Sequence, residues 1–284
     1  MCVTCGCSDD GKVKVTDLGT GDITVMNLHH NQHHHTHTLS DGSAIAHSHH
    51  HHNMSEPIHS ENANIHAKVH STTISLEADI LTKNNLLAAQ NRGWLKGRNI
   101  LAVNLMSSPG SGKTTLLTRT INDLKRKLEI SVIEGDQETV NDAQKIQETG
   151  CKVVQINTGT GCHLDAAMVE KGLEKLDPSF NSVVMIENVG NLVCPALFDL
   201  GETTKVVILS VTEGEDKPIK YPHIFRSSQV MILTKIDLLP YVQFDVQRCI
   251  EYAKQVNPQI TIFQVSAMND AGLNDWYNWL MVNS

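Results

Sequence analysis

The last two-thirds of this 284-residue chain alternates short apolar runs with segments of helical periodicity. The runs are rich in Val, Ile and Leu and lie at residues 100–106, 130–134, 153–157, 183–187, 206–211, 230–234 and 260–265. The first run is mostly apolar without alternation, which is typical of a strand covered on both faces. The pattern predicts a doubly wound α/β domain with a mostly parallel sheet over residues 98–284.

The first third of the chain has a different pattern. Leu76, Ile80, Leu81 and Leu87 recur among polar residues, which predicts an amphipathic linking helix over residues 72–97. Residues 29–71 offer almost nothing to bury and hold 14 of the 16 histidines, which predicts a flexible arm. A purification tag is the alternative, but tags are uninterrupted and usually terminal. Residues 1–28 form a separate cysteine-containing segment.

Composition narrows the functional classes. The formal charge is −8 and aromatic residues make up 4%, which argues against a nucleic-acid partner bound through phosphates or base stacking. No apolar run is long enough to span a membrane, and the first residues lack the pattern of a secretory signal, so a cytoplasmic protein is expected. Seven cysteines, an odd number, favour metal or redox chemistry over disulfides.

A phosphate-binding loop follows the first predicted strand. Its residues are Ser107, Ser108, Pro109, Gly110, Ser111, Gly112, Lys113, Thr114 and Thr115, which match the P-loop pattern except that Ser107 replaces the first Gly. Gly110 and Gly112 allow backbone N–H groups to approach phosphate oxygens, and a helix over residues 114–128 points its N-terminus at them. Lys113 is expected to reach the β- and γ-phosphates. A chance Gly/Ser turn is the alternative, and the strand–loop–helix context disfavours it.

Two later elements indicate guanine. Thr234, Lys235 and Asp237 follow an apolar run and resemble the N/T-K-x-D element, whose carboxylate accepts hydrogen bonds from guanine. Adenine lacks the paired donors, and a buried carboxylate without donors is unfavourable. Ser266 and Ala267 resemble the S-A element that contacts guanine O6 through backbone N–H groups. Their order after the P-loop predicts GTP as the nucleotide.

Acidic residues end two of the predicted strands. Asp136 closes one strand, and Glu187 opens a segment similar to the D-x-x-G switch with Glu in place of Asp. Together with the Thr114 hydroxyl, they are candidate ligands of Mg²⁺, which prefers few carboxylates and several waters beside phosphates. Asp136 and Lys113 are expected to contribute electrostatically to catalysis. The alternative for Asp136 is an N-cap of the following helix.

The cysteines suggest two metal sites. Cys2, Cys5 and Cys7 form a chelate by chain connectivity, suited to Ni²⁺ or, with a fourth ligand, Zn²⁺. Surface thiols without a role are the alternative. The second candidate set is Cys162, His163 and Cys194, whose loops should meet at one sheet edge; buried structural cysteines are the alternative there. Imidazoles of the arm also bind nickel and zinc, which suggests metal storage.

These motifs together resemble the HypB family of hydrogenase nickel-incorporation GTPases. The resemblance covers essentially the whole chain, and its most specific parts are the N-terminal cysteine triad and the Cys-His-Leu-Asp segment that begins at Cys162. It implies a P-loop GTPase of the SIMIBI class that couples GTP hydrolysis to nickel insertion into the large subunit of [NiFe]-hydrogenase. It implies nickel at the triad, a nickel/zinc site at Cys162, His163 and Cys194, homodimerisation, and a small nickel/zinc metallochaperone partner, HypA.

Two other functions compete with this interpretation. A related urease accessory GTPase also couples GTP to nickel, but resembles a Cys-Pro-His switch site, whereas Ala196 follows Cys194 and Pro195 here. A nickel store would make the histidine-rich arm the function and the GTP-binding domain its regulator.

Overall fold

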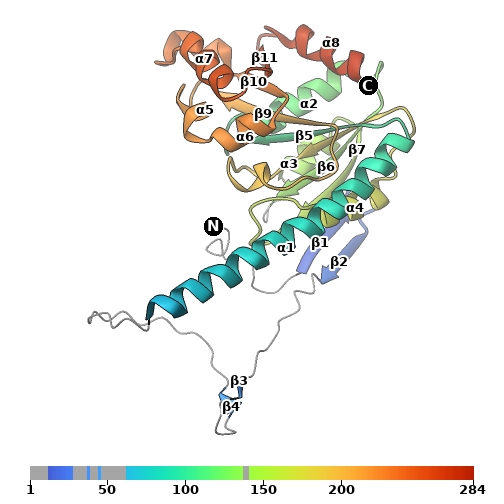
Figure 1. Ribbon diagram of the computed structural model, residues 1–284. Coiled ribbons are helices and arrows are strands. Elements are labelled where there is room, and N and C mark those ends of the chain that lie inside the picture. Colours follow the sequence, from blue (N-terminus) through green and yellow to red (C-terminus); the bar gives the residue numbers. More distant parts are fainter. Residues whose placement is uncertain (1–11, 28–36, 39–43, 46–61, 137–140) are drawn as a thin grey trace.

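The computed structural model describes residues 12–27, 37–38, 44–45, 62–136 and 141–284 (Figure 1). The expected triad of Cys2, Cys5 and Cys7 and most of the histidine-rich arm lie outside the described residues. The described chain forms a mostly parallel α/β domain, as the sequence pattern predicts.

Nine strands make one sheet in the order β11-β10-β9-β5-β8-β6-β7-β1-β2. The seven predicted strands are β5 (Leu101–Ser107), β6 (Ile130–Asp136), β7 (Lys152–Asn157), β8 (Val183–Glu187), β9 (Thr204–Ser210), β10 (Val230–Thr234) and β11 (Thr261–Gln264). All of them pair in parallel. Two very short strands, β3 (His37–Thr38) and β4 (Ala44–Ile45), pair separately from the sheet.

An antiparallel hairpin extends the sheet beyond β7. It consists of β1 (Lys12–Asp17) and β2 (Ile23–Asn27), and β1 pairs antiparallel with β7. The sequence analysis did not predict these strands. The signal was the alternation of buried Val13 and Val15 with exposed Lys14, ahead of a Gly-Thr-Gly turn at residues 19–21. Residues 12–27, in the segment predicted only to bind metal, are therefore part of the fold.

Helices and short 3₁₀ turns connect the strands. They are α1 (Asn62–Gly97), α2 (Lys113–Leu124), α3 (Asn141–Gln147), α4 (Ala166–Leu176), η2 (Cys194–Ala196), α5 (Lys217–Lys220), α6 (Pro222–Ser227), η3 (Ile236–Tyr241), α7 (Val246–Val256) and α8 (Leu273–Asn283). The linking helix begins at Asn62, well before the expected Thr72. Residues 62–71 contain no Gly or Pro, so their polar character alone does not end the helix.

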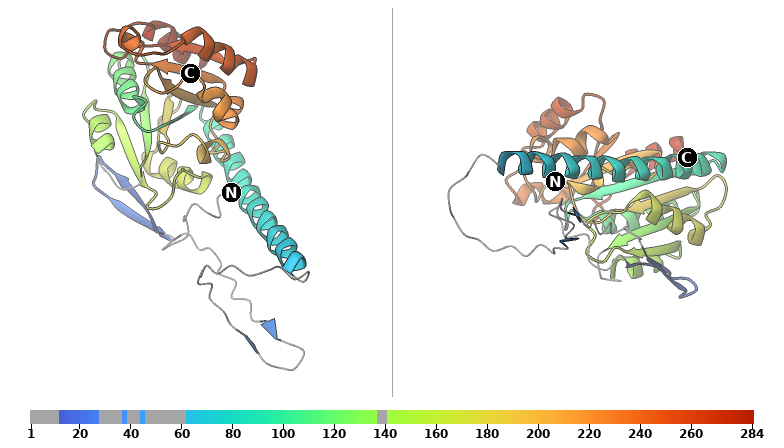
Figure 2. Two further views of the ribbon diagram at one scale, coloured as in Figure 1. Left: turned by 90° about the vertical axis from the view of Figure 1, so that its left-hand side faces the viewer. Right: turned by 60° about the horizontal axis from the view of Figure 1, so that its bottom comes forward.

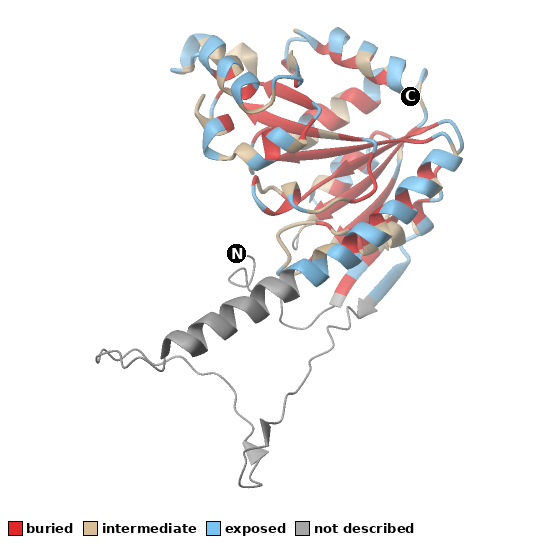
Figure 3. Ribbon diagram, in the orientation of Figure 1, coloured by how far each residue is buried: buried red, intermediate tan, exposed pale blue. Residues whose placement is uncertain are grey.

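Helices cover both faces of the sheet. Leu101, Val103 and Leu105 of β5 belong to the apolar cluster that includes α2, α3 and α8, whereas Ala102 packs in the cluster of α1 and α4 on the opposite face. A third cluster joins Met106 of β5 to α6 and α7. Figure 3 shows the buried residues concentrated on the strands and the exposed residues on the outer helix surfaces.

The long helix α1 runs along one side of this domain, beside α4 (Figure 1). Its N-terminal half continues past the sheet, as the left view in Figure 2 shows. Its C-terminal half contributes buried Ala88 and Leu95 to the fold. The carboxyl ends of β5, β6, β8 and β10 lie at one edge of the sheet, because these strands are parallel, and the candidate site loops leave from that edge.

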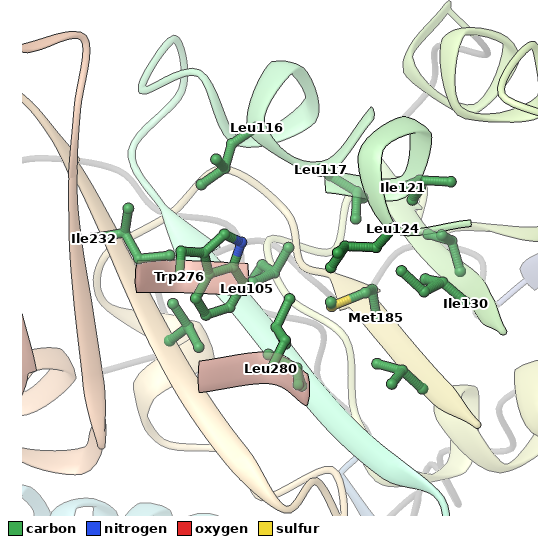
Figure 4. Packing of buried hydrophobic residues seen from close by; sticks show 14 of the residues in the cluster. Leu105, Leu116, Leu117, Ile121, Leu124, Ile130, Met185, Ile232, Trp276 and Leu280 are labelled. Carbon is green, nitrogen blue, oxygen red and sulfur yellow. The ribbon is translucent and has the colours of Figure 1, made fainter. Parts of the chain in front are cut away.

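The core around α8 gives a test of the fold. Trp276 is 1% exposed, lies in the cluster with Leu105 (Figure 4) and donates a hydrogen bond from its indole to the Thr120 hydroxyl at 3.1 Å. Replacing it by Ala (W276A) should lower the free energy of unfolding by about 3–5 kcal/mol, because a large cavity remains. Urea denaturation measures this loss. The exposed Tyr241, as Y241A, is the control; equal losses in both variants would contradict the packing.

Candidate nucleotide and metal sites

The loop between β5 and α2 has the conformation that its glycines allow. Gly110 and Gly112 have φ angles of 76° and 90°, in the left-handed region that side chains disfavour. A side chain at Gly112 would also begin 3.5 Å from the Lys235 Cε atom. α2 begins at Lys113, directly after the loop, so its first N–H groups and positive dipole end face the position expected for phosphates.

Lys113 and Thr114 both contact Glu187 at the end of β8. The Lys113 Nζ atom lies 2.9 Å from Glu187 Oε1, and the Thr114 hydroxyl donates to the same oxygen at 2.6 Å. Glu187 is 1% exposed, and its Oε2 atom has no hydrogen-bond partner among the described residues. A buried carboxylate oxygen without a partner, beside a Thr hydroxyl, fits the oxygen ligands that Mg²⁺ takes.

The neighbouring strand β6 adds two more acidic residues. Glu134 is buried, and its burial, with the charges of Glu187 and Asp136 nearby, raises its pKa to about 9. Glu134 is therefore neutral at pH 7. Asp136 is the last residue of β6, so its carboxylate belongs to the same strand end as Glu134. Residues 137–140, between β6 and α3 (Asn141–Gln147), lie outside the described residues.

The residues expected to read the nucleotide base converge on the P-loop. The Thr234 hydroxyl donates to the Ser111 carbonyl at 2.6 Å, and Lys235 Nζ donates to the Gly110 carbonyl at 2.7 Å. Lys235 has a φ angle of 60°, a left-handed conformation that carries strain in a non-glycine residue. These contacts place the T-K-x-D element directly beside the phosphate-binding loop.

The Asp237 carboxylate is oriented by the second predicted base element. The Ser266 hydroxyl, which is buried, donates to Asp237 Oδ1 at 2.5 Å. Arg119 of α2 donates to the Ala267 carbonyl at 3.1 Å, tying the same loop to the helix that follows the P-loop. The P-loop therefore forms one arrangement with five residues that are distant from it in sequence: Thr234, Lys235, Asp237, Ser266 and Ala267.

The second cysteine set also comes together. The ligand atoms of Cys162, His163 and Cys194 all lie within 4.8 Å of one another. Cys162 Sγ is 3.7 Å from His163 Nδ1. Cys194 is 3% exposed, at the start of η2. Two sulfur atoms and one imidazole nitrogen at this separation form a donor set suited to nickel or zinc.

His163 is kept neutral by its surroundings. Burial lowers the pKa of His163 to about 4, so the imidazole is uncharged at pH 7 and can act as a ligand. Its ring stacks on Phe198 with the centroids 3.9 Å apart. Phe198 follows Cys194 on the same connection, so this stacking holds the two ligand-bearing segments together.

Cys151, Cys249 and His223 lie away from this site. Cys249 is fully buried in the cluster around α7, and Cys151 is partly buried against the cluster around α2, so both pack as apolar side chains. His223 lies exposed on α6.

Asn188 connects the metal-binding loops to the nucleotide side. It directly follows Glu187, is fully buried, and its Oδ1 atom accepts from the Leu164 N–H at 3.2 Å. Its Nδ2 atom donates to Asn104 Oδ1 on β5 at 3.2 Å. Leu164, which follows His163, packs on Gly135 of β6 so closely that a Cβ there would lie 2.7 Å from the Leu164 Cγ.

The switch segment also touches the P-loop itself. A Cβ atom at Gly190 would lie 3.1 Å from the backbone nitrogen of Pro109. The segment from Glu187 to Cys194 therefore begins at the candidate magnesium ligand, passes against the phosphate-binding loop and ends at a candidate metal ligand. Sequence reasoning gave no role to Glu134, Asn188 or Phe198. Glu134 begins the acidic strand end that closes with Asp136, and Asn188 stands at a variable position of the D-x-x-G-like segment, so only their packing shows what they contact.

Comparison with known proteins identifies the family. Residues 101–264 match the model of the CobW/HypB/UreG nucleotide-binding domain. The chain is 45% identical over 295 residues to the hydrogenase maturation factor HypB of Escherichia coli strain K12, covering 99% of this chain and 98% of that protein. The chain belongs to the HypB family of hydrogenase maturation factors.

Other HypB proteins agree with this assignment. HypB of Rhizobium leguminosarum is 56% identical over 211 residues, covering 74% of this chain and 71% of that one. The crystal structure of Archaeoglobus fulgidus HypB has a TM-score of 0.67 at 38% identity, over 72% of this chain and 100% of that one. Helicobacter pylori HypB, solved in complex with nickel, has a TM-score of 0.66 at 37% identity, over 70% and 94%.

No helix in the described part of this HypB-family chain is both long and apolar enough to cross a bilayer.

The buried Glu134 predicts a pH effect on stability. Its pKa is raised on folding from about 4.5 to about 9, so the native state retains a proton that the unfolded chain releases, and stability falls as the pH rises through this window. In E134Q this loss disappears. E134Q should therefore become more stable relative to the unmodified protein as the pH rises from about 5 to about 9.

Urea titrations with a chelator and no nucleotide measure this difference. The exposed Glu251, as E251Q, is the control and should follow the unmodified protein at every pH. A difference for E134Q that stays constant with pH would show that the Glu134 carboxyl does not retain its proton.

Proposed function

We propose that this protein hydrolyses GTP and uses the cycle to bind and release nickel for the large subunit of [NiFe]-hydrogenase. The observation that carries the proposal is the hydrogen bond from the Leu164 N–H to the Asn188 side chain. It joins the segment that holds Cys162 and His163 to the residue after Glu187. Membership of the HypB family and the nickel complex of the Helicobacter pylori relative support the same assignment.

GTP is assigned to the loop between β5 and α2. The N–H groups of Gly110, Ser111, Gly112 and Thr115 would surround its phosphates, and Lys113 would neutralise developing charge at the β- and γ-phosphates. Thr114 and Glu187 would hold Mg²⁺, with Asp136 nearby. When bound, Mg²⁺ would supply positive charge that neutralises the phosphate oxygens.

Asp237 gives the site its preference for guanine. Its Oδ1 atom accepts a hydrogen bond from the Ser266 hydroxyl, which fixes the orientation of the carboxylate. A carboxylate held in this way accepts hydrogen bonds from the guanine N1–H and 2-amino groups, and adenine would leave it without donors. The Lys235 stem is placed to pack on the base.

Nickel is the cargo of the site formed by Cys162, His163 and Cys194, and Zn²⁺ fits the same donors. The neutral His163 offers its nitrogen without first losing a proton. Cys2, Cys5 and Cys7 form a second nickel site, and the histidine-rich arm stores nickel for delivery. The protein acts in the cytoplasm as a homodimer, with a HypA-type nickel/zinc metallochaperone as a partner.

The coupling follows from competition for Lys113. Its amine contacts Glu187 Oε1 at 2.9 Å, and a triphosphate at the loop would compete for the same amine. A shift of Glu187 is passed to Asn188, which is bonded to both β5 and Leu164. The Cys162–His163 segment and the segment leading to Cys194 then move relative to each other, which changes the nickel affinity.

A urease accessory role is the second candidate. The Helicobacter pylori relative that is 37% identical over 212 residues is named as a hydrogenase/urease maturation factor. Ala196 stands where the urease-type Cys-Pro-His switch has its His, which favours hydrogenase for this chain.

Asn188 provides the direct test of coupling. In the unmodified protein, nickel affinity of the Cys162 site should differ at least about fivefold between GDP and a non-hydrolysable GTP analogue, as expected for a linked pair of sites. In N188A the two affinities should converge, because the link to Leu164 is lost. Nickel titration followed by the thiolate–nickel absorption band, in a variant with Cys2, Cys5 and Cys7 replaced by Ser, measures both, because the imidazoles of the arm do not contribute to that band. Asn283, as N283A, is the control, and an unchanged ratio in N188A would overturn the coupling.

A variant of Lys113 distinguishes the GTPase hypothesis from the nickel-store hypothesis. In a host that lacks its own copy of the gene, K113A should abolish hydrogenase activity even with added nickel, because the nucleotide cycle is lost. Deletion of residues 29–61 should lower hydrogenase activity only at low nickel, because the arm stores the metal. Full activity of K113A would show that GTP chemistry is dispensable and would favour storage. Urease activity in the same strains distinguishes the second candidate.

A further inference from the structure

One face of α1 lies against both ligand-bearing segments. Asn84, Ala88 and Asn91 share this face because they are spaced by four and three residues, and all three are buried. Asn84 is 6% exposed and Asn91 is 4% exposed. Buried amides on a helix surface are unfavourable unless they are hydrogen-bonded, so their partners indicate what they do.

Asn84 bonds to both segments at once. Its Oδ1 atom accepts from the Ala166 N–H at 2.9 Å, three residues after His163. Its Nδ2 atom donates to the Asp199 carbonyl at 2.7 Å, on the connection that begins at Cys194. One side chain therefore joins the two segments that carry the metal ligands.

Asn91 repeats this arrangement two turns further along the helix. Its Nδ2 atom donates to the Ala166 carbonyl at 2.8 Å and to the Leu200 carbonyl at 3.0 Å. Both N–H donors of one amide are thus used on backbone oxygens of the two different segments. With Asn84, four hydrogen bonds fix the separation of the segments.

The helix approaches the second segment as closely as its atoms allow. A Cβ atom at Gly201 would lie 2.6 Å from the Ala88 carbonyl oxygen, and Gly201 has a φ angle of 90°. Arg92 forms an ion pair with Asp199 at 2.5 Å, and the same carboxylate oxygen accepts from the Gly201 N–H. The close contact leaves little room for the Cys194 connection to move away from α1.

We propose that Asn84 and Asn91 are positioning residues of the metal site formed by Cys162, His163 and Cys194. They touch no ligand atom, but they fix the distance between the two backbones that present the ligands. The inference rests on the proposed nickel site. It adds that α1, which leads from the histidine-rich arm, sets the metal affinity of the domain.

The test uses the full chain with Cys2, Cys5 and Cys7 replaced by Ser, so that thiolate–nickel absorption reports the Cys162 site. Adding N84A and N91A together should weaken nickel binding at least about tenfold, the scale of losses when residues that orient metal ligands are removed. The thiolate–nickel absorption band should also shift, whereas affinity for GDP should change less than about twofold. A purely structural role would lower stability without moving the band.

Leu280 supplies the matched control. It lies on α8, is fully buried, and packs in the apolar cluster of α2, α3 and α8, which contains no residue of either ligand-bearing segment. L280A should lower the unfolding temperature at least as much as the asparagine variants do while leaving nickel affinity and the absorption band unchanged. Unchanged nickel binding in the N84A/N91A variant, or equal weakening in L280A, would overturn the positioning role.

The same experiment separates this inference from the proposed function. The variant with Cys2, Cys5 and Cys7 replaced by Ser should bind nickel, and adding C162S and C194S should remove the thiolate–nickel band. If both results are found, the proposed metal site is supported independently of the result for the asparagine variants. If the variant with the three Ser replacements shows no thiolate–nickel band, the proposed metal site fails first.

Discussion

The side-chain amide of Asn188 is the contact on which the arrangement of both sites depends. It is fully buried between β5, the end of β8 and the segment that follows Cys162. A buried amide holds its position strongly, because each group left without a partner would raise the free energy of the fold. Asn188 directly follows Glu187 in the chain. A shift of Glu187 at the end of β8 would therefore also shift Asn188, which is bonded to Leu164.

The amide is one end of a longer buried polar network. Asn104 receives the Asn188 bond and donates to Glu202 Oε1 at 3.1 Å, and Glu202 Oε2 accepts from the Leu200 N–H. Burial raises the pKa of Glu202, although Lys205 lies 3.6 Å away. Leu200 is also bonded to Asn91. A chain of hydrogen bonds therefore connects the end of β8 to α1, and residues of both ligand-bearing segments take part in it.

The sequence predicts the seven parallel strands and the P-loop because their signals are local. Apolar runs and glycines at fixed spacing need no tertiary contact to be recognised. The convergence of Cys162, His163 and Cys194 was also expected, since it follows from placing loops at one edge of a parallel sheet. The hairpin of β1 and β2 was missed because short alternating strands at an edge have weak signals. Asn84, Asn91 and Asn188 were missed because a buried amide looks like any surface asparagine in the sequence.

The candidate metal site differs in its donor set from a structural zinc site. Structural zinc sites are usually closed by four protein ligands, whereas catalytic zinc sites have three protein ligands and keep one position for water or substrate. Among the described residues the site offers three donors, from Cys162, His163 and Cys194. Val193 and Leu197, on either side of η2, are 52% and 46% exposed, so the site borders an apolar surface. Under the proposed function, three donors held at fixed spacing would leave a coordination position for a ligand from a recipient protein, and the exposed Val193 and Leu197 would be the first residues that such a protein meets.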